Sequence, residues 1–129
     1  MNTYTKQTIQ SQMGAYPEIK LGYYFGSQAK GKGKPLSDHD FAIYLDESTT
    51  PARKFEIVGG ITADLMQVIG SNNIDLVLIN DAHNIPLIYT VFSQGELIYE
   101  IEPYRMLVGS KHLSAYHDFQ VFTTKHDHT

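Results

Sequence analysis

Two apolar runs of strand length are separated by a short segment of glycine, lysine, serine and aspartate. The first run, Ile19–Phe25, is rich in aromatic and β-branched residues and stops at Gly26. The second run covers residues 38–45 and begins with acidic residues. Apolar runs of this length between glycine and polar residues predict β-strands. We therefore expect two strands of one sheet, with a tight turn directly after the first strand and acidic residues at the start of the second.

Helical patterns surround these two strands. Apolar residues recur at intervals of three and four along most of the remaining chain, which predicts amphipathic helices. Pro51 suits a first helical position and Gly70 a C-cap, whereas Gly59 and Gly60 weaken the helix that contains them. The predicted helices cover residues 3–16, 27–30, 52–69, 85–94 and 104–124, and the predicted strands cover residues 19–25, 38–45, 74–79 and 97–99.

This alternation of helices and strands predicts one α/β domain over residues 1–129, built on a small sheet. Ser27 is expected near the N-cap of the short helix 27–30, and the tail 125–129 is expected to fray. No internal repeat and no linker interrupts the pattern. A second domain is therefore not expected.

Composition excludes several classes of protein. The 129 residues are 42% hydrophobic and 19% charged, as expected for a soluble globular protein. Cysteine is absent, which excludes disulfides and zinc sites with cysteine ligands. A net charge of −4 argues against direct nucleic-acid binding. Neither a secretory signal nor a run of the ~20 apolar residues of a membrane span is visible. A cytoplasmic protein with no membrane contact is the expectation.

The acidic residues have a spacing that suggests a metal site. Ten residues separate Ser27 from Asp38, and Asp40 follows two residues later. Residues i and i+2 of a strand point to the same side, so two carboxylates would repel each other there unless a cation lies between them. Asp75 heads a third apolar run and joins the pair if the second and third strands are neighbours. Three carboxylates together with phosphate oxygens suit Mg²⁺, and a pair of such ions suits phosphoryl chemistry.

Each of these features has a simpler interpretation when it is taken alone. A Gly-Ser turn is common between a strand and a helix, an Asp-x-Asp pair is most often a solvated strand end, and Asp75 alone fits a turn or cap. Lys30 fits either a solvated loop or a contact with a polyphosphate, and the histidine between the two acids is expected to point away from them. The features occur in order along strand, turn, strand and strand, which favours a nucleotide site. The spacing differs from that of a P-loop.

These residues resemble the pattern of the DNA polymerase β-like nucleotidyltransferase superfamily, and most closely that of its minimal nucleotidyltransferase (MNT) branch. The family pattern, Gly-Ser followed by ten residues and Asp-x-Asp, falls on Gly26, Ser27, Asp38 and Asp40. The third family acid falls on Asp75. The resemblance covers about residues 19–100. It implies the nucleotidyltransferase fold, with a mixed sheet of about four strands and the helix 104–124 outside that core.

The resemblance also implies roles for these residues. Asp38, Asp40 and Asp75 would be the catalytic residues and would bind Mg²⁺, two ions in all. Asp75 would bind the catalytic metal or deprotonate the attacking hydroxyl. Gly26, Ser27 and Lys30 would bind the nucleotide, with ATP as the substrate.

Small members of this branch are typically antitoxins of type VII-like toxin–antitoxin systems. They transfer AMP to a tyrosine of a HEPN-domain ribonuclease toxin, so we expect a hetero-oligomer with such a partner. Because the chain leaves little sequence for an acceptor domain, the acceptor is expected on another protein. Two alternatives stay open: an antitoxin that neutralises by binding alone, and a nucleotidyltransferase for a small molecule such as an aminoglycoside.

Overall fold

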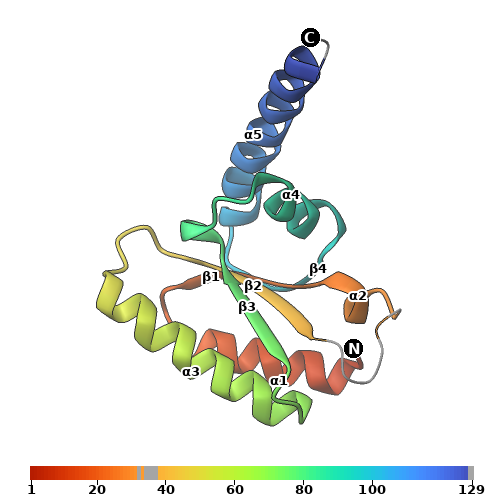
Figure 1. Cartoon of the computed structure of the whole chain (residues 1–129). Helices are drawn as coiled ribbons and strands as arrows, with labels where there is room; N and C mark the ends of the chain where they lie inside the picture. Colours follow the sequence, from red (N-terminus) through yellow and green to blue (C-terminus); the bar gives the residue numbers. More distant parts are fainter. Residues whose placement is uncertain (32, 34–37, 128–129) are drawn as a thin grey trace.

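A four-stranded sheet lies between two pairs of helices in the computed structural model (Figure 1). The structure describes residues 1–31, 33 and 38–127, leaving out the side chains of Ser27 and residues 122–127. The elements are, in chain order, α1 (Thr3–Gly14), β1 (Ile19–Phe25), α2 (Gly26–Ala29), β2 (His39–Leu45), α3 (Pro51–Ile69), β3 (Ile74–Leu78), the 3₁₀ helix η1 (Ile79–Asp81), α4 (Ile85–Gln94), β4 (Glu96–Glu100) and α5 (Tyr104–Asp127).

The sheet is mixed, with the strand order β3-β2-β1-β4. Strand β1 runs antiparallel to both β2 and β4, whereas β2 and β3 are parallel. Helix α3 makes the crossover between the two parallel strands, as a parallel pair requires. The expected mixed α/β fold of about four strands is confirmed, and so is the expected adjacency of the second and third strands.

Each face of the sheet carries its own hydrophobic core. Phe41, Ile43 and Leu45 of β2 are fully buried on one face, in the same cluster as residues of α1 and α3. Ala42 and Tyr44 alternate with them and join the cluster formed with α4 and α5. Figure 1 shows these two helix pairs on opposite sides of the sheet. Burying one large apolar side chain stabilises the fold by about 1.5–3 kcal/mol. A shift of one residue in the strand pairing would move these side chains out of their cores, so burial on both faces fixes the register.

Helix α3 runs through its two glycines without a break. Gly60 faces Tyr16, and a Cβ at this position would collide with the Tyr16 hydroxyl. Gly59 is exposed, and a Cβ there would meet no atom within 4 Å. Close packing against Tyr16 therefore explains the glycine at position 60, whereas no contact requires a glycine at position 59. Gly70 ends the helix in the left-handed conformation, with φ 76°, as expected for a C-cap.

The glycine pair gives a matched test of packing in α3. Gly59→Ala should raise the free energy of unfolding by about 0.5–1 kcal/mol, because alanine restricts the unfolded chain and favours the helix. Gly60→Ala should lower it, because the new methyl group displaces the Tyr16 ring. Urea denaturation of the two variants measures both effects. Equal changes in the two variants would contradict this assignment.

Several boundaries differ from the sequence prediction. The short helix α2 begins at Gly26 and has Phe25 as its N-cap, so the N-cap expected at Ser27 is wrong. Strand β2 begins at His39, which leaves Asp38 just outside it. Helix α5 continues to Asp127, past the expected limit at residue 124, so the fraying expected at residues 125–127 is wrong. Most of the loop expected after Gly31, and the last two residues, lie outside the described residues.

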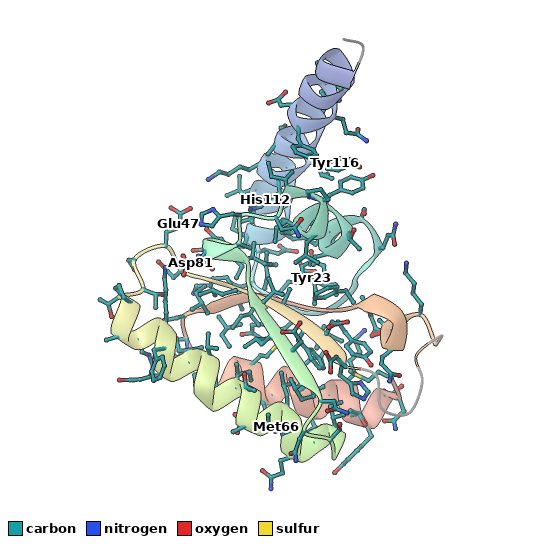
Figure 2. The ribbon with its side chains drawn as sticks, viewed as in Figure 1. Tyr23, Glu47, Met66, Asp81, His112 and Tyr116 are labelled. Atoms are coloured by element: carbon teal, nitrogen blue, oxygen red, sulfur yellow. The ribbon has the colours of Figure 1, made fainter. Side chains whose placement is uncertain are left out.

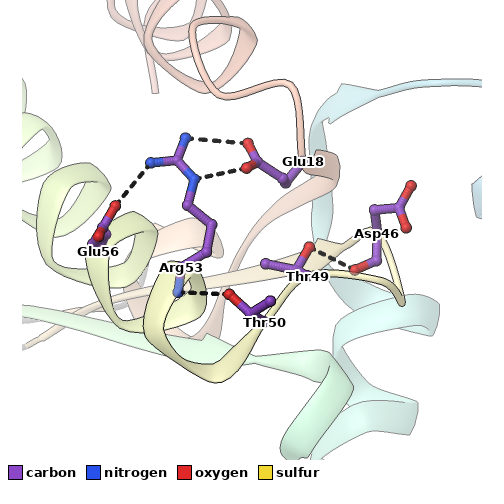
Figure 3. Close-up of polar contacts among 6 residues, drawn as sticks. All are labelled: Glu18, Asp46, Thr49, Thr50, Arg53 and Glu56. Carbon is purple, nitrogen blue, oxygen red and sulfur yellow. Dashed lines mark hydrogen bonds and ion pairs between the residues drawn. The ribbon is translucent and has the colours of Figure 1, made fainter.

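An ion-pair cluster joins Glu18, which directly precedes β1, to α3 (Figure 3). Because Ile19 pairs with Leu45 and Phe25 with Asp40, this cluster lies at the end of β1 opposite the acidic residues. The Arg53 guanidinium donates to both carboxylate oxygens of Glu18, at 2.6 and 3.2 Å, and to Glu56 at 3.2 Å. The backbone amide of Arg53 donates to the Thr50 hydroxyl, which caps α3. This cluster has a structural role, distant from the candidate site. Along the described part of the chain, no helix combines the length and apolar character that a membrane crossing requires.

Candidate active site

The residues of the predicted motif meet at one end of the sheet. There β1 ends, β2 and β3 begin, and α2 leaves the sheet (Figure 1). Phe25 at the end of β1 pairs with Asp40, and Asp40 pairs with Asp75 across the parallel β2–β3 ladder. The turn and two of the three acids are therefore brought together by the strand register.

Asp40 and Asp75 lie side by side on the same face of the sheet. Residues paired in register project to the same side, and neighbouring strands are about 4.8 Å apart. Asp40 belongs to a central strand and is half-buried, whereas Asp75 belongs to the edge strand β3 and is exposed. One carboxylate is thus held inside the site while the other is open to a large molecule.

The surroundings of Asp40 disfavour its negative charge. Burial raises the pKa of the Asp40 carboxyl above its usual value, and the carboxylates of Asp75 and Asp38 raise it further. His39 has a smaller, opposite effect on this pKa. A cation bound between these carboxylates would remove the repulsion. The site therefore has the electrostatic character of a cation site.

Gly26 allows the backbone to approach Asp40 closely. Its φ is 81°, a conformation that residues with a side chain rarely adopt. A Cβ at this position would also collide with Oδ2 of Asp40. Both observations explain why glycine, and no larger residue, stands at the turn that follows β1.

Asp38 is the third predicted acid, and it lies apart from the paired two. It is exposed and precedes β2. It is still near enough to raise the pKa of Asp40. His39 projects to the opposite face, where its Nδ1 lies 2.8 Å from the hydroxyl of Tyr24. The expectation that this histidine points away from the acids is confirmed.

Lys30 and Ser27 complete the predicted set of site residues. The Lys30 ammonium donates to Oε1 of Gln94, at 2.6 Å, and so links the C-cap of α2 to the end of α4. Ser27 belongs to α2, but its side chain lies outside the described residues. The contacts of Gln94 with Lys30 and of Tyr24 with His39, which stands between two of the acids, were not anticipated, since only the tertiary fold brings these residues together.

The donor atoms of the site suit magnesium. Asp38, Asp40 and Asp75 offer carboxylate oxygens, the ligands that Mg²⁺ prefers. Among the side chains that the structure describes, which end at residue 121, no three acidic or histidine side chains lie close enough together to hold a metal ion. The structure thus brings together a pair of acids with Asp38 nearby. The chemistry of the donors fits the cation, and the three-ligand arrangement stays a prediction.

Similarity to a known family agrees with this site. Residues 7–104 match the family described as Polymerase beta, Nucleotidyltransferase. Because this match covers more than half of the chain, the protein belongs to that nucleotidyltransferase family. None of the curated proteins matches the sequence.

Solved structures share the fold over nearly the whole chain. A toxin–antitoxin complex with AMP-PNP contains a chain of 22% identity and TM-score 0.72, covering 97% of this chain and 94% of that chain. A mutant of the toxin–antitoxin complex MntA-HpeT gives 21% identity and TM-score 0.73 with the same coverage. The tri-AMPylated Shewanella oneidensis HEPN toxin in complex with MNT antitoxin gives 21% and 0.70, also over 97% and 94%. The similarity confirms the nucleotidyltransferase fold.

Proposed function

We propose that this protein is an antitoxin that transfers AMP from ATP to a tyrosine of a HEPN-domain ribonuclease toxin, in a Mg²⁺-dependent reaction. The observation that carries the proposal is the in-register pairing of Asp40 with Asp75 beside the Gly26 turn, in a chain of the nucleotidyltransferase family. Transfer of AMP would neutralise the toxin, and the two proteins would form a hetero-oligomer. A cytoplasmic location stays a prediction from the sequence.

The proposed roles follow from position in the site. Asp38, Asp40 and Asp75 would hold the metal, and the Gly26–Ser27 turn with Lys30 would hold the phosphates of ATP. Two divalent cations supply charge neutralisation at the phosphates and at the attacking oxygen when they are bound. The chain itself contributes positioning and electrostatic stabilisation, which dominate phosphoryl-transfer catalysis.

In the transfer step the phenolic oxygen of the acceptor forms a bond to the α-phosphorus. The bond from that phosphorus to the oxygen bridging to the β-phosphorus breaks, and pyrophosphate leaves with the electron pair. The phenolic proton passes to the carboxylate of Asp75. Asp75 suits this role because it is exposed on an edge strand, where the side chain of another protein can reach it.

Solved structures of the same fold support the proposed partner and nucleotide. They include a toxin–antitoxin complex with AMP-PNP and a tri-AMPylated HEPN toxin in complex with MNT antitoxin. The MntA-HpeT mutant carries two Asp→Glu substitutions two positions apart, the same spacing as Asp38 and Asp40. These complexes are formed by other proteins, and they favour the same substrate and partner here.

Helix α5 offers a surface suited to a protein partner. Its outer half projects beyond the rest of the fold (Figure 1). Met106 is 70% exposed and Leu107 63% exposed, which is unusual for apolar side chains. Met106 and Leu113 also line a groove of about 350 Å³ with Tyr23 and Phe92. An exposed apolar face beside the sheet favours a protein acceptor over a small molecule.

Labelled ATP tests the proposal directly. The protein is mixed with Mg²⁺, ATP labelled on the α-phosphate, and a folded HEPN protein encoded beside it. Label should appear on a tyrosine of the HEPN protein and its ribonuclease activity should fall. Absence of label with a folded partner would overturn the proposal.

The two alternatives give different results in the same system. If the protein neutralises by binding alone, the double variant Asp38→Asn with Asp40→Asn should still protect cells from the toxin. If the acceptor is a small molecule such as an aminoglycoside, the protein should confer resistance in cells that lack the HEPN protein. Loss of protection in the double variant, without any resistance, supports the proposed transferase.

A further inference from the structure

We propose that Tyr24 and His39 form a positioning pair that fixes the segment carrying Asp38 and Asp40, and thereby sets the affinity of the site for a divalent cation. This inference rests on the proposed function in one respect, namely that these acids bind a metal. Neither Tyr24 nor His39 belongs to the motif, and both lie on the face of the sheet away from the acids.

The pair joins β1 to β2 across the sheet. Tyr24 is paired with Phe41, so His39 is its diagonal neighbour on the same face. The hydroxyl of Tyr24 lies 2.8 Å from Nδ1 of His39, and the two rings are stacked with centroids 6.1 Å apart and planes at 16°. The Tyr24 ring also packs against Phe41, at 4.9 Å. The tyrosine is only 4% exposed, so the core holds it and it can in turn hold the histidine.

The backbone of His39 is fastened from the other side. Its amide donates to the carbonyl of Asn73 at 2.7 Å, and the residue pairs with Ile74 of β3. His39 is thus tied to β1 through its ring and to β3 through its backbone. These contacts restrain both the peptide and the side chain of the residue that stands between the two acids.

Among the described residues, none restrains the Asp38 carboxylate by a hydrogen bond or an ion pair. Asp38 is exposed and precedes β2, and the residue that follows it, His39, is the first one held in that strand. A metal site requires its ligands in a narrow range of distances, and supporting residues that orient ligands commonly change metal affinity. Loosening His39 should therefore weaken cation binding by letting Asp38 move relative to Asp40.

A hydrogen bond that serves only stability would behave differently. Its loss would lower the melting temperature and leave metal affinity unchanged. Tyr44 provides the matched control: it is 6% exposed, and its hydroxyl donates to Glu47 at 2.9 Å. Tyr24→Phe and Tyr44→Phe each delete one hydroxyl and one hydrogen bond from a buried ring, but only the first contacts the acid-bearing segment.

Binding of Mn²⁺ provides a readout that does not need catalysis. The full chain is titrated with Mn²⁺ without nucleotide, which would itself chelate the cation, and free Mn²⁺ is followed by electron paramagnetic resonance. Tyr24→Phe should weaken Mn²⁺ binding about threefold to tenfold, the range that corresponds to one lost hydrogen bond. Tyr44→Phe should change it less than about twofold. Circular dichroism checks that both variants are folded.

Substitutions of His39 test the pair from the other side. His39→Phe keeps a ring but removes the ring nitrogen that contacts the Tyr24 hydroxyl, so it should weaken Mn²⁺ binding as Tyr24→Phe does. Combining the two changes should add little further loss, because both delete the same contact. His39→Asn places an oxygen near the position of Nδ1 and should recover most of the affinity.

The outcomes separate this inference from the proposed function. Unchanged Mn²⁺ affinity in Tyr24→Phe, an equal loss in Tyr44→Phe, or no Mn²⁺ binding by the wild-type protein would overturn the positioning pair. If the wild-type protein binds Mn²⁺ but transfers no AMP to a folded HEPN protein, the proposed function fails. The Mn²⁺ titrations then still decide the role of Tyr24 and His39.

Discussion

Replacing Asp40 with asparagine should reduce AMP transfer by about a thousandfold, the upper range for loss of one electrostatic group at a reacting centre. Asp40 is the half-buried acid of the site and stands between Gly26 and Asp75. Asparagine keeps the shape of the side chain but lacks the negative charge that a divalent cation requires. Single-turnover transfer of labelled AMP to the HEPN protein measures this loss.

The same substitution should stabilise the protein when metal is absent. Burial and the neighbouring carboxylates raise the pKa of Asp40 in the folded state above its usual value of 3.8. The folded state therefore holds the proton more tightly, and stability falls as the pH rises through the range between the two pKa values. Asp40→Asn removes this penalty. Its melting temperature in EDTA should exceed that of the wild type near neutral pH, and the difference should vanish as the pH falls to the usual pKa.

Asp81 supplies a control carboxylate away from the site. It is exposed and pairs with Lys54 at 3.1 Å. Asp81→Asn should keep normal transfer and show no rise in melting temperature in EDTA.

Magnesium should narrow the difference in melting temperature between Asp40→Asn and the wild type, since only the wild type is stabilised by the bound cation. Full transfer activity in Asp40→Asn would contradict the assigned site.

Much of this architecture could be predicted because local composition determined it. Ile19–Phe25 forms a strand with the predicted limits, since β-branched and aromatic residues fill it and Gly26 ends it. The neighbouring positions of Asp40 and Asp75 follow from the helix α3, because a strand–helix–strand unit usually places its two strands in parallel and side by side. These parts depend on patterns within a few tens of residues.

Contacts that depend on tertiary register could not be predicted. The hydrogen bond between Tyr24 and His39 requires the pairing of Tyr24 with Phe41, which the length of the connecting segment does not determine. The bond from Lys30 to Gln94 joins residues 64 positions apart. Tyr116 lies on α5 (Figure 2). Its ring stacks on that of Tyr89 in α4, with 3.8 Å between the ring centroids, and this contact also needs the packed fold. The periodicity of the sequence indicates which face of a helix is apolar, but it does not determine which helix or strand packs against that face.

Gly26→Ala should damage both the fold and the site. Alanine at φ 81° costs about 1–2 kcal/mol of stability. Its Cβ would also collide with Oδ2 of Asp40, so either the carboxylate or the turn must move. Because a displacement of about 1 Å at a reacting centre can cost about a hundredfold in rate, transfer should fall by about that factor. Urea denaturation and single-turnover transfer measure the two effects separately.

Gly70→Ala separates backbone strain from the collision. Gly70 has φ 76°, close to that of Gly26, and a Cβ there would meet no atom within 4 Å. Both variants should therefore lose stability through backbone strain, while only Gly26→Ala, which adds the collision with Asp40, should lose transfer. Asp40 then accounts for the difference, since the two glycines share their backbone conformation and differ in what lies beside them. Equal transfer rates in the two folded variants would mean that the close approach of Gly26 to Asp40 has no part in the chemistry.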